Sequence, residues 1–139
     1  MTWIVDTCVL IDIALADPKF GESSMRSLER HSGEGLAISP VSLIEIAPVF
    51  DGKIEELNEF IDFLGLNPFW SWQSTETTRA IKGWSDYVLE RRKIRQDKRV
   101  IADFLIGAFA ERHGGLITRN PKDFKAYFPK LKIVDPSHE

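Results

Sequence analysis

Apolar residues follow two different patterns along this chain. Short unbroken apolar runs are typical of strands buried on both faces, and longer stretches with an apolar residue every three or four positions are typical of amphipathic helices. The segment 67–72, NPFWSW, fits either an edge strand or an aromatic loop. Clear strands are predicted at 2–6, 36–39, 116–118 and 131–135.

Helices are predicted between these strands, and several carry start or stop signals. Thr7 can cap the first helix, and Ser39 followed by Pro40 provides an N-cap and a first helical residue. Gly114 and Gly115 should end the last long helix. The predicted helices cover 8–16, 22–32, 40–47, 53–65, 74–92 and 98–113, with a short one from residue 121.

The order of these elements predicts the fold class. Buried strands that alternate with helices favour a parallel sheet with helices on both faces, here an α/β fold of four to five short strands. The chain of 139 residues is long enough to bury a core, so we expect residues 1–139 to form a single domain. In such sheets, ligands bind at the carboxyl ends of the strands.

Composition narrows the classes of protein that remain. A net charge of −3 is too small to indicate a charged partner, so any surface for nucleic acid must be local. Cys8 is the only cysteine, which excludes an internal disulfide and a cysteine-based zinc site. No apolar stretch is long enough for a membrane helix, and the first residues do not resemble a signal peptide. We therefore expect a cytoplasmic protein with no membrane partner.

Three acidic residues stand in strongly apolar surroundings. Asp6 follows the first strand, Glu45 lies in VSLIEIAPV and Asp103 lies in IADFLIGAFA. Each has a structural explanation: Asp6 as an N-cap, and Glu45 as the partner of a distant basic residue. Asp103 could pair with Arg99, four residues before it. Three separate buried ion pairs are a less economical account than one divalent cation shared by all three acids, and ligands that are all oxygen favour Mg²⁺ or Mn²⁺.

The segment TRNPKDF at 118–124 allows two interpretations. In the structural one, Asn120 is the N-cap of a short helix, Pro121 is its first residue and Asp123 accepts bonds from backbone N–H groups. In the functional one, Asn120 or Asp123 binds the metal or orients a water beside the strand end.

Four segments occur in an order that resembles the PIN-domain nucleases. They are DTCVLIDI, SPVSLIEIA, ADFLIGAFA and ITRNPKDF, and they span essentially the whole chain. The sequence looks most like the VapC-type subgroup, the toxin halves of bacterial and archaeal type II toxin–antitoxin pairs. No single segment is specific; their order and spacing carry the resemblance.

The resemblance implies a PIN-like fold and a metal-dependent endoribonuclease that hydrolyses phosphodiester bonds in tRNA, rRNA or mRNA and so inhibits translation. Asn120 stands where the family often has aspartate, which leaves open whether one or two metal ions bind and whether Asp123 compensates. Thr7 and Thr118 match hydroxyl residues near the acids. Asp6, Glu45 and Asp103 match the three acids that hold Mg²⁺ or Mn²⁺, and the implied catalytic set is Asp6, Glu45, Asp103, Asn120 and Asp123.

A local basic segment is the candidate surface for RNA. LERRKIRQDKRV at 89–100 leads directly into the helix that carries Asp103. A solvated helix end is the alternative explanation of these charges. The expected RNA-binding residues are Arg91, Arg92, Arg95, Lys98, Arg99 and Arg119.

The resemblance also implies two protein partners. VapC-type toxins form homodimers, and a cognate antitoxin lies in an apolar groove and reaches the active site. The alternative function is a catalytically silent PIN-like module that binds RNA or a protein.

Overall fold

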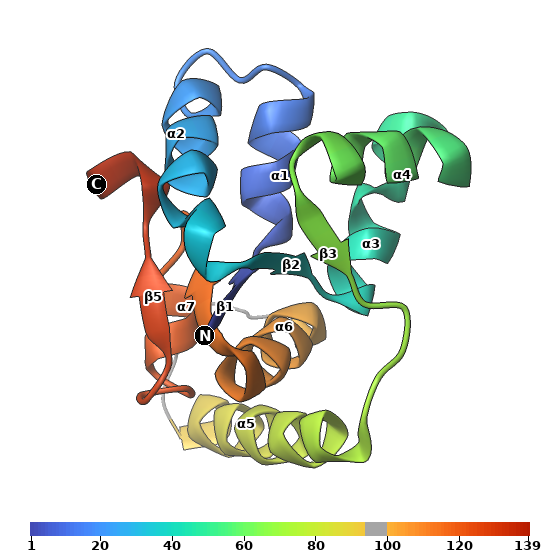
Figure 1. The fold of residues 1–139 in the computed structure, drawn as a ribbon. Helices are drawn as coiled ribbons and strands as arrows, with labels where there is room; N and C mark the ends of the chain where they lie inside the picture. Colours follow the sequence, from blue (N-terminus) through green and yellow to red (C-terminus); the bar gives the residue numbers. More distant parts are fainter. Residues whose placement is uncertain (94–99) are drawn as a thin grey trace.

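The computed structural model describes the backbone of residues 1–93 and 100–139, together with their side chains except those of residues 92 and 93. The described residues form a five-stranded, fully parallel sheet with the strand order β3-β2-β1-β4-β5 (Figure 1). This confirms the predicted α/β fold. The strands are β1 (Thr2–Val5), β2 (Leu36–Ile38), β3 (Leu66–Pro68), β4 (Gly114–Ile117) and β5 (Lys132–Val134).

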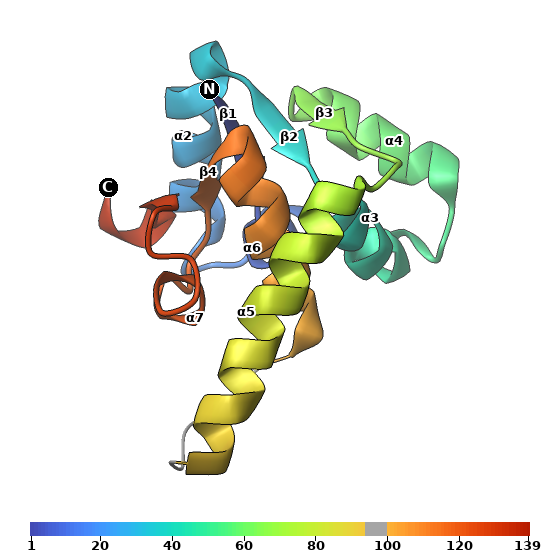
Figure 2. The same cartoon turned by 90° about the horizontal axis from the view of Figure 1, so that it is seen from below.

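Helices cover both faces of the sheet. In Figure 1, α1 and α2 lie above the sheet and α5 and α6 below it, and Figure 2 shows the long α5 crossing in front of α6. The helices on the first face are α1 (Thr7–Ala14), α2 (Gly21–His31), α3 (Pro40–Ile46) and α4 (Ile54–Phe63). Those on the second are α5 (Ser74–Lys93), α6 (Ile101–His113) and α7 (Lys122–Lys125).

Alternate residues of the central strands build two separate cores. Trp3 and Val5 of β1 pack into the core beneath α1 to α4, whereas Ile4 packs into the aromatic core formed with α5, α6 and α7. This alternation follows from the strand geometry, in which successive side chains point to opposite faces. Both faces are therefore sealed, and the carboxyl edge of the sheet is left for polar groups.

Two glycines set the close approach of β4 to β1. Gly114 has φ +134°, and a Cβ atom on Gly115 would lie 2.5 Å from the Trp3 ring. Thr2 pairs with Gly114 and Val5 with Ile117. The sequence placed both glycines in a helix stop; they do end α6, but they also form the first half of β4.

Most predicted elements are confirmed within one to three residues. In the region that fitted either an edge strand or an aromatic loop, both occur: edge strand β3 ends at Pro68, and residues 69–72 have no regular secondary structure. Two predicted caps are wrong. Asp6, and not Thr7, is the N-cap of α1, because its carboxylate accepts the Thr7 N–H. Asn120 does not cap α7, whose N-terminal position is Pro121 with no side-chain cap.

Two further expectations concern the helices. None of the helices in the described ranges is both long and apolar enough to span a bilayer. The predicted helix over 98–113 is found from Ile101, with Val100 as its N-cap, and its predicted residues 98 and 99 fall outside the described residues.

Candidate active site

Asp6 lies at the centre of the carboxyl edge, directly after β1. Its side chain is buried, with 6% of the residue exposed. Oδ1 accepts the Thr7 N–H at 2.8 Å, and Oδ2 accepts the Thr118 hydroxyl at 2.7 Å and the Cys8 thiol at 3.4 Å. These three donors fix the carboxylate in one orientation.

Glu45 reaches the same edge from α3. Its Oε1 lies 2.8 Å from the Thr7 hydroxyl, which also lies 2.8 Å from the hydroxyl of Ser42. Thr7 thus connects the two acidic residues, since its N–H bonds Asp6 and its side chain contacts Glu45. Ser39 caps α3 by accepting the Ser42 N–H, which aims the first turn of that helix at Thr7.

The surroundings of the Asp6 carboxyl group disfavour its charged form. Burial raises the pKa of Asp6, hydrogen bonds from Thr118, Cys8 and Thr7 oppose this increase, and the nearby charge of Glu45 adds to it. The Cys8 thiol is also perturbed: burial, and then the charge of Asp6, raise its pKa to about 12. Positive charge near Asp6 would stabilise its ionised form.

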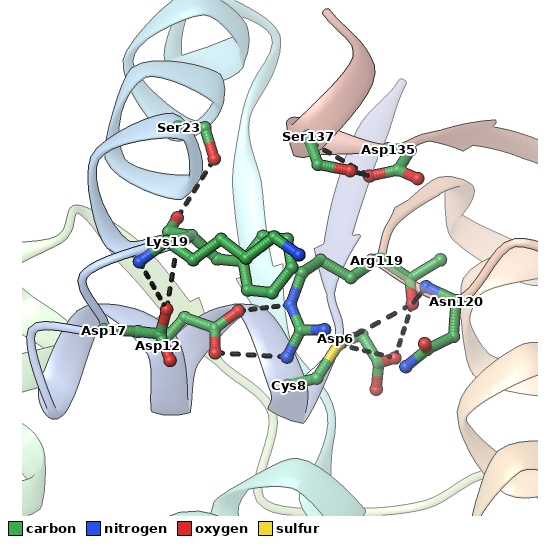
Figure 3. A network of polar contacts seen from close by, with 12 residues as sticks. Asp6, Cys8, Asp12, Asp17, Lys19, Ser23, Arg119, Asn120, Asp135 and Ser137 are labelled. Atoms are coloured by element: carbon green, nitrogen blue, oxygen red, sulfur yellow. Dashed lines mark hydrogen bonds and ion pairs between the residues drawn. The ribbon is translucent and has the colours of Figure 1, made fainter.

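The other predicted catalytic residues occupy elements that lead to this edge. Asp103 is partly buried in the first turn of α6, and β4 runs back along α6 so that the helix start lies toward the carboxyl end of β4. Asn120 is exposed, and its N–H bonds the Thr118 hydroxyl at 3.1 Å. Asp123 is partly buried in α7, and Figure 3 shows Asn120 beside Asp6.

The structure brings two of the three predicted metal ligands together. In the described part of the chain, no three His, Cys, Asp or Glu side chains are arranged as a ready-made metal cluster. The expected convergence of Asp6, Glu45 and Asp103 into one cluster is therefore not found. Asp6 and Glu45 still fit a magnesium-like cation, because such ions take one or two carboxylates and complete their shell with water and phosphate oxygens.

The predicted RNA-binding residues fall into three groups. Arg91 is exposed near the end of α5. Arg119 is partly exposed, and its guanidinium pairs with Asp12. The backbone of Arg95, Lys98 and Arg99 and the side chain of Arg92 lie outside the described residues.

Sequence reasoning missed two polar residues of this region, Asp12 and Ser42. Asp12 stands in the apolar segment VLIDIAL, the same kind of surroundings that singled out the three acids. Ser42 carries no comparable signal, because a serine in a helix is compatible with many roles. His31 is a further polar residue with defined contacts: its ring packs at a tilt against Trp3, with the ring centroids 4.9 Å apart, and it pairs with Glu139.

The fold and this edge together define a small parallel α/β domain with an acidic site at the carboxyl ends of its central strands. A family model described as the PIN domain matches residues 3–128. The chain therefore belongs to the PIN domain family. Among proteins of curated function, none matches the sequence.

Three solved structures share the fold at low sequence identity. VapBC2 from Rickettsia felis, bound to a DNA fragment from its promoter, is 20% identical with a TM-score of 0.69 over 96% of this chain and 98% of that one. FitAcB from Neisseria gonorrhoeae is 19% identical with a TM-score of 0.70 over the whole of both chains. FitAB bound to the IR36 DNA fragment is 20% identical with a TM-score of 0.71, covering 100% and 97%.

Proposed function

We propose that this PIN domain is a divalent-metal-dependent endoribonuclease that uses Mg²⁺, with Mn²⁺ as a substitute. The observation that carries the proposal is the pair of carboxylates, Asp6 and Glu45, which two different strand–helix units bring to either side of Thr7 at the carboxyl edge. Burial of Asp6 and the charge of Glu45 both favour a cation there.

Each residue of the site has a defined part in this function. Asp6 and Glu45 would hold the cation, with Asp103 and then Asn120 or Asp123 completing the polar edge. Thr118 and Thr7 orient Asp6 through hydrogen bonds to its two oxygens. When bound, the cation lowers the pKa of a coordinated water and offsets the charge that develops on a scissile phosphate.

The same proposal includes a biological role as a VapC-like toxin of a type II toxin–antitoxin pair, forming a homodimer and inhibiting translation. Structures with this fold include VapBC2 and FitAB. An apolar groove of about 390 Å³ lies beside the site, and its residue Ile44, 74% exposed, adjoins Glu45 on α3. A cognate antitoxin with an apolar segment and a basic side chain fits this groove. Its lining residues are Pro40, Leu43, Ile44, Ala47, Ile54, Leu57 and Trp70.

The test of nuclease function compares the purified wild type with Asp6→Asn. Asparagine is as good an N-cap as aspartate, so this variant should fold while losing the negative charge. We expect the wild type to cleave RNA with Mg²⁺ and not with EDTA, and Asp6→Asn to lose both cleavage and binding of Mn²⁺ in isothermal titration. Glu22→Gln is the matched control, because the Glu22 side chain is 94% exposed and forms its ion pair with Arg26 of the same helix.

Two outcomes would contradict the proposal. Cleavage by Asp6→Asn at the wild-type rate would show that the carboxylate is not needed. Absence of both cleavage and Mn²⁺ binding in the wild type, with RNA still bound, would instead support the catalytically silent module.

A further inference from the structure

Arg119 occupies a position between two residues of the candidate site. The preceding residue, Thr118, donates a hydrogen bond from its hydroxyl to Asp6. The following residue, Asn120, donates its backbone N–H to the Thr118 hydroxyl. The sulfur of Cys8 lies against the same loop, 3.8 Å from the Thr118 hydroxyl oxygen. The loop of residues 118–120, which follows β4, thus places polar groups next to Asp6.

The side chain of Arg119 crosses to α1, and Figure 3 shows its guanidinium beside Asp12. Its Nε and one terminal nitrogen donate to the two carboxylate oxygens of Asp12, the second of these bonds at 3.1 Å. Only 5% of Asp12 is exposed. A two-point contact of this kind fixes the direction of the guanidinium as well as its distance.

The turn between α1 and α2 holds the guanidinium from a second direction. The Arg119 Cζ atom lies 4.2 Å from the centre of the Phe20 ring, a cation–π contact. Asp17 orders this turn by accepting the N–H groups of Lys19 and Phe20 at 2.8 and 2.9 Å. Asp12 and Phe20 therefore engage both an edge and a face of the guanidinium.

We propose that Arg119 is a positioning residue of the nuclease site, which acts through Asp12 to hold the 118–120 loop against Asp6, and that it is not a contact for RNA. The inference rests on the proposed nuclease function. It replaces the RNA-binding role expected for Arg119, since the Asp12 carboxylate offsets the charge of the guanidinium and, with the Phe20 ring, fixes its orientation. Loss of the contacts of Arg119 with Asp12 and Phe20 would let the Thr118 hydroxyl move away from Asp6.

The key variant is the neutral pair Asp12→Asn/Arg119→Gln. Replacing Arg119 alone would leave the buried charge of Asp12 without a partner and endanger folding, whereas the double substitution removes both charges together. We expect faster amide hydrogen exchange in the 118–120 loop, and a fall in kcat of about 10- to 100-fold, the usual range for groups that orient metal ligands. The Kd for RNA should not change.

Two single variants sharpen the result. Arg119→Lys keeps the charge but not the planar fork, so it should behave like the neutral pair and should not rescue kcat. Arg26→Ala is the matched control, because Arg26 is an exposed arginine of α2 that pairs with Glu22 of the same helix. It should leave exchange, kcat and Kd unchanged.

A direct contact with RNA predicts the opposite set of results. The neutral pair would then bind RNA more weakly, with the slope of log K against log salt reduced by about one, and exchange in the loop would stay at the wild-type rate. That outcome overturns the proposal. If the wild type cleaves no RNA, the proposed nuclease function is wrong. Separately, unchanged amide exchange in the 118–120 loop of the neutral pair would overturn the positioning role of Arg119.

Discussion

Gly107 of α6 provides a sharp test of how tightly α6, which carries Asp103, packs against the segment that follows α7. A Cβ atom built on Gly107 would lie 2.4 Å from Cε2 of Phe128, far inside the ~3.5–4.0 Å at which carbon atoms attract. Phe128 is 1% exposed and has Arg79 over its ring at 4.4 Å, so the ring has little room to move. Overpacking costs about 1–3 kcal/mol, and alanine recovers up to about 1 kcal/mol of helix propensity. We expect Gly107→Ala to lose about 2 kcal/mol, because the contact is short and involves several ring atoms.

Urea unfolding followed by circular dichroism measures this loss. Gly33→Ala is the matched control, because nothing lies within 4 Å of a Cβ at that position in the 3₁₀ turn Ser32–Glu34. Its free energy of unfolding should stay within about 0.5 kcal/mol of the wild type. A Gly107→Ala protein as stable as the wild type would refute the close packing of α6 against the segment after α7.

Three further predictions follow from single contacts. Ser39→Ala removes the cap of α3 and should lower the free energy of unfolding by about 1 kcal/mol in urea titrations. Thr118→Val removes the hydroxyl that orients Asp6 and should weaken Mn²⁺ binding about 10- to 100-fold by isothermal titration; unchanged affinity would exclude that role. Burial, and then the charge of Arg112, lower the pKa of His113 below 6.5 in the folded protein. Below that pH the unfolded chain binds more protons at this residue than the folded protein does, so the free energy of unfolding falls as the pH drops through 6.5. His113→Gln should therefore lose less stability than the wild type between about pH 7 and pH 5, and equal losses would contradict this assignment.

The fold could be predicted because its signals are local. Buried strands such as TWIV and LAI are short apolar runs bounded by polar residues, and Ser39-Pro40 marks a helix start by backbone chemistry alone. The role of the glycines at the start of β4 could not be found this way. Gly115 is small because the Trp3 ring packs over it, and that contact joins residues more than 100 positions apart.

The site was only partly predictable for the same reason. Asp6 stands out as an acid after a buried strand, and the structure places Glu45 near it as expected. The roles of individual polar atoms depend on contacts across the sheet: Thr7 was expected to cap a helix, and instead its hydroxyl contacts Glu45. Arg119 was assigned to RNA from its charge, because nothing in the sequence links it to Asp12 on another element.

The pairing of β1 with β4 carries a consequence for which changes in length the domain can accept. Val5 is aligned with Ile117, and the Asp6 N–H bonds the Ile117 carbonyl at 2.9 Å, so Thr118 comes to rest beside the Asp6 carboxylate. Inserting or deleting one residue within Gly114–Ile117 would turn every later side chain of that strand to the opposite face. Ile117 or Arg119 would then stand beside Asp6, so the number of residues in β4 decides which side chain meets the Asp6 carboxylate.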